Sequence, residues 1–247
     1  ASLQKISPTT DFSDLADVQL VIEAVDEDRE TKIEVTHKAE ALVKPTTVFA
    51  SNTSTIPITS LAKTSRRPEN FVGLHFFSPV HRMALVEIIL GKKTSDACLA
   101  LAMDFASFIG KTPIVVNDGR GFYTSRVFGT YVQEGMAMLA EGISPALIEN
   151  AGRLAGMPVG PLAVADEVSL QLIHRVSLQT KADLGNAYVD PPGAQVIDQM
   201  VTKLGRFGKK DGKGFYDYPS DKDKLLWLLL PTHFPQKPTK EQPCVEW

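Results

Sequence analysis

The sequence predicts an α/β domain followed by an all-helical domain. Short apolar runs rich in β-branched residues alternate with amphipathic stretches of helical spacing as far as residue 117, which is typical of a parallel sheet. Beyond that point the strand-like runs stop and only helical patterns continue. We therefore expect an α/β domain over residues 1–118, a helical domain over residues 119–218, and a linker or the start of a further domain over residues 219–247.

Each element of the first domain has its own pattern. The run at residues 20–25 lacks alternation, which suits a parallel strand buried on both faces. Apolar residues recur at helical spacing over residues 27–43 and 95–109, and Pro57 opens a shorter helix between them. The remaining expected strands are residues 47–51, 71–75, 84–90 and 112–117.

The second domain is expected to consist of helices. Residues 205–218, which follow them, are rich in glycine and lysine and end in aromatic residues, and residues 219–247 are rich in proline. The expected helical stretches are residues 121–141, a helix that starts at Ser144 and Pro145, residues 162–182 and residues 193–203.

The composition argues against several classes of partner. With 43% hydrophobic and 22% charged residues, the 247-residue chain resembles an ordinary globular protein. Its net charge of −3 argues against nucleic acid or an anionic membrane as the main partner, and no apolar run reaches membrane-spanning length. Cys98 and Cys244 are too far apart for metal or redox spacing, so we expect a core thiol and a tail thiol in a reducing compartment.

The segment from His75 to Glu87 carries the clearest chemical pattern. His75 ends one predicted strand, a turn follows at Ser78 and Pro79, and Glu87 lies within the next apolar run. A carboxylate in an apolar strand needs a partner, and an imidazole bonded to it would have its tautomer fixed and its protonated form favoured. We therefore predict that His75 is a general base supported by Glu87. The alternative is a structural histidine at a strand end.

Polar residues also follow the first two predicted strands. In open α/β sheets, ligands bind at the carboxyl ends of the strands. The hydroxyls and amides of residues 51–55 can donate hydrogen bonds there, Glu27 can accept from ribose hydroxyls, and Lys32 can meet a phosphate or a carbonyl. The alternatives are a plain Ser/Thr-rich turn and a solvated first helical turn.

Two glycine-rich segments each allow two interpretations. Residues 119–126 join the two predicted domains, where a substrate can lie, or they form a plain linker and helix cap. Residues 205–218 lack the spacing of a P-loop. They offer basic side chains and backbone amides to phosphates, or they form a rigid loop whose aromatic residues pack on the core.

Taken together and in this order, these segments resemble the 3-hydroxyacyl-CoA dehydrogenase family. Ser78 and the GFYTSR segment at residues 121–126 are most similar to the dehydrogenase part of multifunctional fatty-acid oxidation proteins, in which an enoyl-CoA hydratase domain precedes this region. The other matching motifs are LVIEAV at 20–25, ASNTS at 50–54, GLHFFSP at 73–79, LVEII at 85–89, GKTPIVV at 110–116, GMPVGP at 156–161 and GKGFY at 212–216.

The resemblance implies a reaction, a cofactor and a set of residues. The reaction is NAD-dependent oxidation of a 3-hydroxyacyl-CoA to a 3-oxoacyl-CoA in fatty-acid β-oxidation. His75 would be the general base paired with Glu87, and Ser54 would hold the hydroxyl oxygen and also touch the nicotinamide. The remaining assignments are Val25, Asp26, Glu27, Lys32 and Ser78 to the cofactor and Ser125 to the substrate.

The sequence departs from the family pattern in two respects. Ser78 and Ser125 occupy positions where single-function members usually carry Asn, although multifunctional members often have small hydroxyl residues there. The glycine-rich dinucleotide loop of the family would precede the region that matches Ile6, and no such loop is present. We therefore expect an incomplete Rossmann-type domain that alone binds NAD weakly or not at all, and a chain that is a fragment or a processed piece.

The resemblance also implies partners and leaves two alternatives. The expected partners are an acyl-CoA substrate, a thiolase subunit and a second copy of the chain, in a bacterial-like cytoplasm or in an organelle matrix. One alternative is a hydroxyacid dehydrogenase with a catalytic lysine on its helical side, against which the HFF motif argues. The other is a non-catalytic acyl-CoA-binding or assembly module of a β-oxidation complex.

Overall fold

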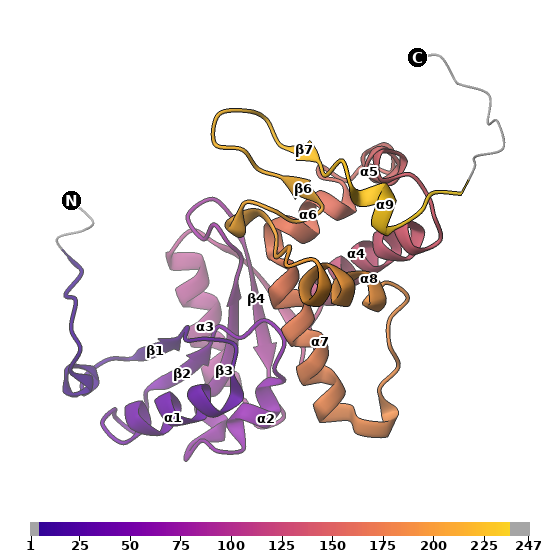
Figure 1. The fold of residues 1–247 in the computed structure, drawn as a ribbon. Helices are drawn as coiled ribbons and strands as arrows, with labels where there is room; N and C mark the ends of the chain where they lie inside the picture. Colours follow the sequence, from indigo (N-terminus) through magenta and orange to yellow (C-terminus); the bar gives the residue numbers. More distant parts are fainter. Residues whose placement is uncertain (1–4, 238–247) are drawn as a thin grey trace. The chain divides into compact units, whose positions relative to one another are not determined.

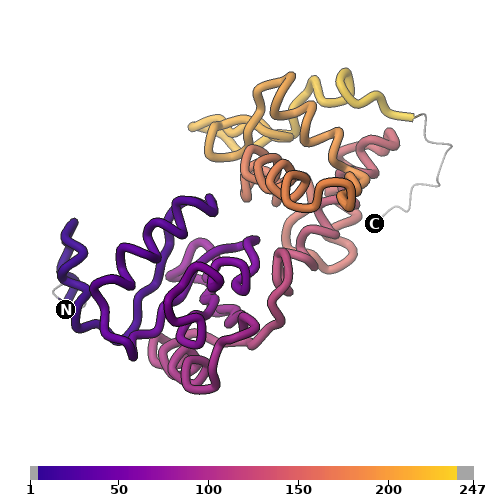
Figure 2. Tube along the Cα trace, turned by 90° about the horizontal axis from the view of Figure 1, so that it is seen from below, coloured from indigo at the N-terminus to yellow at the C-terminus, as the bar shows by residue number. Residues whose placement is uncertain are grey.

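The computed structural model describes residues 5–237, so Cys244 lies outside the described residues (Figure 1). The chain divides into two compact units, residues 1–126 and 127–247. The chain passes from one unit to the other within helix α4 (Thr124–Ala140), which can be followed along the trace in Figure 2. The boundaries expected at residues 118 and 218 remain predictions.

The first unit is built on a five-stranded sheet in the order β1-β2-β3-β4-β5. β1, β2 and β3 are parallel, β4 runs antiparallel to β3, and β5 is parallel to β4. The expected all-parallel sheet is therefore mixed, because the connection between β3 and β4 contains no crossover helix and a parallel pair requires one. The strands are β1 Leu20–Glu23, β2 Val48–Ser51, β3 Phe71–Phe76, β4 Leu85–Leu90 and β5 Thr112–Asn117.

Helices cover both faces of this sheet, because successive side chains of a strand point to opposite faces. α1 and α2 pack on the face that carries Phe49 and Phe71, and α3 packs on the face that carries Val48 and Val72. The helices are α1 Arg29–Glu40, α2 Ile58–Ala62 and α3 Asp96–Phe108.

β1 differs from the strand expected at residues 20–25. It lies at an edge of the described sheet, and Ile22 is 36% exposed. An edge strand has a neighbour on one side only, so the apolar run is half-buried rather than buried on both faces.

The second unit is helical, as the sequence predicts, with two changes. The expected helix at 162–182 is divided at Ser169, whose φ of 92° is not helical and whose side chain caps α7. The helix expected from residue 121 begins at Thr124, because Gly121 and Phe122 have positive φ. The other elements are α5 Pro145–Leu154, α6 Pro161–Val168, α7 Leu170–Leu184, α8 Ala194–Asp198, a π-helical turn Gln199–Lys203, β6 Tyr216–Asp217, β7 Leu225–Leu226 and α9 Leu230–His233.

The segments after residue 204 contribute to the core of the second unit. Phe215 and Tyr216 are buried in it, which supports the rigid-loop interpretation of residues 205–218. Leu230 and Phe234 belong to the same core. In the described part of the tail, to residue 237, Leu230 and Phe234 are therefore buried, whereas Leu225, Leu228 and Leu229 are exposed.

Among residues 5–237, no helix combines the length and the apolar character that a membrane span needs.

Candidate active site

The hairpin of β3 and β4 brings His75 and Glu87 together. The two residues are directly opposite each other in the antiparallel register, where side chains of paired residues share a face. His75 Nδ1 and Glu87 Oε2 are 2.7 Å apart. His75 is 5% exposed and Glu87 is fully buried. The predicted pairing is therefore present as a short, desolvated contact.

Further donors surround the Glu87 carboxylate. Its Oε1 accepts hydrogen bonds from the backbone N–H groups of Tyr123 (3.1 Å) and Thr124 (2.9 Å). Its Oε2 accepts a second bond from Thr124 Oγ1, at 2.7 Å. Burial by itself would raise the pKa of Glu87, but the hydrogen bonds from His75 and Thr124 outweigh burial and hold that pKa below its ordinary value. Glu87 is therefore an anion.

An anionic Glu87 fixes the tautomer of His75. The carboxylate can only accept, so Nδ1 of His75 carries the proton in this contact. Within the described residues, His75 Nε2 has no hydrogen-bond partner. The atom is also not fully buried, so it is accessible to a ligand. The rings of Phe77 and Phe122 lie 4.6 Å and 5.9 Å from the imidazole, centroid to centroid, and give it apolar walls.

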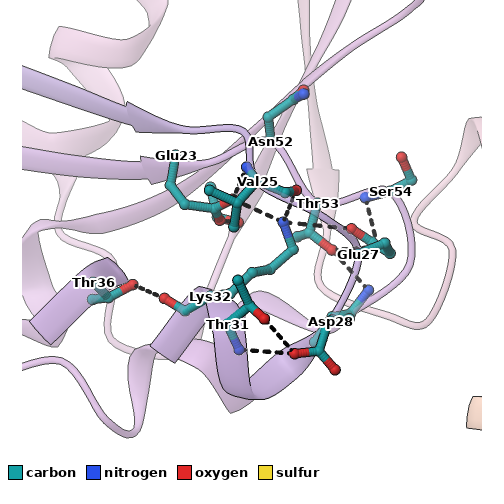
Figure 3. A network of polar contacts seen from close by, with 12 residues as sticks. Glu23, Val25, Glu27, Asp28, Thr31, Lys32, Thr36, Asn52, Thr53 and Ser54 are labelled. Atoms are coloured by element: carbon teal, nitrogen blue, oxygen red, sulfur yellow. Dashed lines mark hydrogen bonds and ion pairs between the residues drawn. The ribbon is translucent and has the colours of Figure 1, made fainter. Parts of the chain in front are cut away.

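A second polar network lies at the carboxyl ends of β1 and β2 (Figure 3). Lys32, only 1% exposed, places Nζ 2.8 Å from Glu23 Oε1 and 3.2 Å from the Val25 carbonyl oxygen. The same ammonium is 3.6 Å from Glu27 Oε2. The second oxygen of Glu23 accepts from Ser51 Oγ at 2.6 Å. Lys32 is thus held between two carboxylates.

Glu27 organises the loop that contains Ser54. Its Oε1 accepts from Thr53 Oγ1, from Ser54 N, and from both N and Oγ1 of Thr55, at 2.7–3.0 Å. Burial of Glu27 acts to raise its pKa, but these bonds and the Lys32 charge prevail, so the pKa is lowered. Ser54 Oγ makes no hydrogen bond among the described residues and is half-buried. The loop therefore presents Ser54 Oγ as a free donor.

The remaining predicted site residues do not join either network through side-chain contacts among the described residues. Val25 and Asp26 are exposed just beyond β1, and Ser78 is exposed in the connection after β3. Ser125 is half-buried in the first turn of α4. Their roles toward cofactor and substrate remain predictions.

Two residues of these networks were not singled out from the sequence: Thr124 binds Glu87, and Glu23 binds Lys32. Asn52, which belongs to the predicted polar segment 51–55, accepts from Phe76 N at 2.8 Å and joins the ends of β2 and β3. Glu23 stands in an apolar run as Glu87 does, so the same rule about buried carboxylates identifies it. In the described part of the chain, no three His, Cys, Asp or Glu side chains are grouped to hold a metal ion.

Comparisons with known proteins identify the family of this chain. The family model for the 3-hydroxyacyl-CoA dehydrogenase NAD-binding domain matches residues 1–119, and that for the C-terminal domain matches residues 121–218. The chain is 39% identical over 221 residues to the fatty acid oxidation complex subunit alpha of Shewanella loihica, covering 90% of this chain and 31% of that protein. It therefore spans about a third of the length of this curated relative.

Solved structures show the same fold. (S)-3-hydroxybutyryl-CoA dehydrogenase PaaH1 from Ralstonia eutropha superposes with a TM-score of 0.81 at 35% identity, over 89% of this chain and 77% of that chain. 3-Hydroxybutyryl-CoA dehydrogenase from Escherichia coli K12 gives a TM-score of 0.79 at 31% identity, over 91% of this chain and 48% of that chain. The predicted resemblance is confirmed, and the chain belongs to the 3-hydroxyacyl-CoA dehydrogenase family.

Proposed function

We propose that this chain carries the proton-transfer site of an NAD-dependent 3-hydroxyacyl-CoA dehydrogenase that forms 3-oxoacyl-CoA in fatty-acid β-oxidation. The observation that carries the proposal is the buried pair of His75 and Glu87 with the Nε2 atom of the imidazole left open. An oriented imidazole of this kind contributes about 10²–10⁴-fold to a proton-transfer step.

The chain's own residues account for the proton in this reaction. His75 takes the proton of the 3-hydroxyl group at Nε2 as the C3–H bond breaks and the C3 carbonyl forms. NAD⁺, when bound, supplies the acceptor for the hydride that leaves C3. Glu87 stabilises the imidazolium through the 2.7 Å contact with Nδ1. Ser54 Oγ, held by the loop that Glu27 organises, donates a hydrogen bond to the developing carbonyl oxygen.

The residues present fit the nicotinamide end of NAD. The free hydroxyl of Ser54 and the exposed segment at Val25 and Asp26 lie at the carboxyl edge of the sheet, where such ligands bind. Lys32 and Glu27 fix this edge through internal contacts. The pyrophosphate end requires a glycine-rich loop, for which the sequence offers no segment.

The names of the relatives support proposals about partners. A relative called a fatty acid oxidation complex subunit alpha supports an acyl-CoA substrate and further subunits of a complex as partners. A thiolase subunit and a second copy of the chain rest on the family resemblance alone. Its bacterial source supports a cytoplasmic location, with an organelle matrix as the alternative.

The test measures NADH oxidation with acetoacetyl-CoA. We would compare the chain itself, the chain extended upstream with a glycine-rich dinucleotide loop, and the extended chain with His75→Ala. We expect activity in the extended chain and a loss of about 10²–10⁴-fold on His75→Ala. His174→Ala is the matched control, because its ring makes only a surface contact of 3.3 Å with Asp198, and it should leave the rate unchanged.

The opposite outcome is also informative. If the extended chain is folded and binds NADH but does not oxidise it, the role of His75 fails. Binding of acetoacetyl-CoA without turnover would then favour an acyl-CoA-binding or assembly module.

A further inference from the structure

The oxygen of Glu87 that meets His75 also meets Thr124. His75 Nδ1 and Thr124 Oγ1 both lie 2.7 Å from Oε2. The other oxygen, Oε1, takes the backbone N–H groups of Tyr123 and Thr124. Backbone amides are available from any residue except proline, so among the described residues the hydroxyl of Thr124 is the one donor to Glu87, besides His75, that depends on side-chain identity.

The start of helix α4 explains why these donors converge on Glu87. Gly121 and Phe122 have φ of 74° and 47°, which turns the chain before the helix begins. The first N–H groups of a helix have no partner within it, and the helix dipole favours an anion there. Glu87, reaching from β4, satisfies two of these groups and so caps a helix that is distant in sequence.

The hydroxyl of Thr124 constrains the carboxylate beyond what the amides do. Two amides on Oε1 hold one oxygen, whereas a donor on Oε2 also fixes the rotation of the carboxylate plane. It takes up part of the negative charge on the oxygen that faces the imidazole.

We propose that Thr124 is a positioning residue for the dehydrogenase reaction, acting through Glu87 on His75. This inference rests on the proposed function. Thr124 keeps Oε2 aimed at Nδ1 and shares the charge of that oxygen, so it limits how strongly Glu87 stabilises the imidazolium. A general base that releases its proton readily can serve both directions of the reaction.

The neighbours of the Glu87 carboxylate come from three elements. His75 faces Glu87 from β3, and Ile114 is the uncharged register partner of Glu87 on β5. From the start of α4 come Tyr123 and Thr124, which contact the carboxylate through uncharged donors. A change in the Nδ1–H signal of His75 on removal of the Thr124 hydroxyl therefore reports on Glu87.

The test is Thr124→Val, which removes the hydroxyl, keeps the branched shape and retains the backbone amide. In Thr124→Val, Oε2 keeps only the His75 Nδ1–H as a side-chain donor, so we expect the hydrogen bond between Nδ1 and Oε2 to change. Thr124→Ser keeps a hydroxyl and should stay close to the unaltered protein. Thr130→Val is the control on the same helix, since Thr130 Oγ1 donates only to the Val127 carbonyl, at 2.7 Å.

The measurement is nitrogen NMR of ¹⁵N-histidine in the full chain, with the His75 signals assigned by their loss in His75→Gln. It needs no cofactor. The expected result is a changed Nδ1–H signal of His75 in Thr124→Val and an unchanged one in Thr124→Ser and Thr130→Val. A folded Thr124→Val with an unchanged His75 overturns the proposal, and so does a Thr124→Ser that shifts as far as Thr124→Val. If Thr124→Val does not fold, Thr124→Ala takes its place, because it also removes the hydroxyl that bonds Oε2, and an unchanged Nδ1–H signal in it overturns the proposal.

Measuring kcat and KM in the extended chain distinguishes failure of this proposal from failure of the proposed function. In the extended chain we expect Thr124→Val to lower kcat about tenfold with KM nearly unchanged, because the residue touches neither substrate nor cofactor. An inactive extended chain with an unaltered sequence contradicts the proposed function and leaves the NMR result to judge Thr124. An active one whose kcat is unaffected by Thr124→Val contradicts the role of Thr124 alone.

Discussion

Each unit of the molecule contains a buried carboxylate that accepts backbone N–H groups, and the two differ in what else they meet. Glu87 in the first unit has the titratable imidazole of His75 as a direct partner and a lowered pKa. Asp166 in the second unit accepts from Phe215 N and Tyr216 N, both at 2.9 Å, and from the hydroxyl of Tyr218 at 3.0 Å. Burial of Asp166 raises its pKa to about 6, because these neutral donors and the charge of Arg206 do not compensate for burial.

The difference separates a reactive site from a structural one. A carboxylate next to a titratable base stays charged and can support proton transfer, whereas one surrounded by amides and phenols mainly fixes the backbone. Asp166 ties the GKGFY segment to α6, and Glu149 does the same for the start of α6, accepting from Leu162 N at 2.7 Å. The second unit therefore uses its buried acids for packing.

The largest effect on the rate is expected from removing the charge of Glu87. In Glu87→Gln the amide NH₂ competes with the Nδ1 proton of His75, which favours the tautomer whose Nε2 carries a proton and accepts none. We expect the extended chain to lose about 10²–10⁴-fold in the rate of NADH oxidation with acetoacetyl-CoA. The matched change in the other unit, Asp166→Asn, should leave the rate within about twofold. Equal losses in both variants would remove the distinction between the two sites.

The next effect is steric and concerns stability. A Cβ on Gly214 would lie 2.0 Å from Asp166 Oδ1, so Gly214→Ala should displace the carboxylate and cost about 3 kcal/mol or more in the free energy of unfolding. Gly212→Ala is the control, since its φ is +76° and no atom lies within 4 Å, so only backbone strain of about 1 kcal/mol is expected. Chemical denaturation measures both. A Gly214→Ala no worse than Gly212→Ala would show that Asp166 does not hold this segment.

A smaller effect is the pH dependence of stability. The pKa of Asp166 rises from 3.8 to about 6 on folding, so between these values the folded protein keeps a proton that the unfolded chain loses. The contribution of Asp166 to the free energy of unfolding is greatest below about pH 4 and declines as the pH rises to about 6. Denaturation at several pH values should show a decline that Asp166→Asn lacks and that Asp221→Asn, at an exposed position, retains. The same decline in Asp166→Asn would assign it to another group.

The smallest effect sharpens the comparison at one hydrogen bond. Tyr218→Phe removes the 3.0 Å bond to Asp166 Oδ2 and should cost about 1 kcal/mol in the free energy of unfolding. Because that bond favours the charged carboxylate, the pKa of Asp166 should rise further. Titration of the carboxyl carbon by NMR measures the shift. A lowered pKa would mean that the hydroxyl favours the neutral acid.

Much of the first unit could be predicted because its elements depend on local pattern. The apolar runs define the strands, and the sequence from His75 to Glu87 forms a hairpin whose register pairs the two residues. The antiparallel direction of β4 agrees with the short bend predicted at Ser78 and Pro79, whereas the alternation of strands and helices alone indicates a parallel sheet.

The rest of the site depends on contacts between segments distant in sequence. Thr124 meets Glu87 across 37 positions, and Glu27 receives the Ser54 amide across 27. No local sequence pattern links residues this far apart, so hydrogen bonds of this kind can be identified only from the assembled structure. The packing of Leu230 and Phe234 in a proline-rich tail is a further example, because composition there favours a linker while burial decides otherwise.

The central claim is that anionic Glu87 holds the proton of His75 on Nδ1 and leaves Nε2 as the proton acceptor. Nitrogen NMR of His75 in the chain as it stands, at a pH above the titration of its imidazole, tests this most directly. We expect Nδ1 to be protonated and Nε2 to be unprotonated. A protonated Nε2 with a bare Nδ1 would contradict it, because Glu87 would then not be the hydrogen-bond acceptor that the proposed chemistry requires.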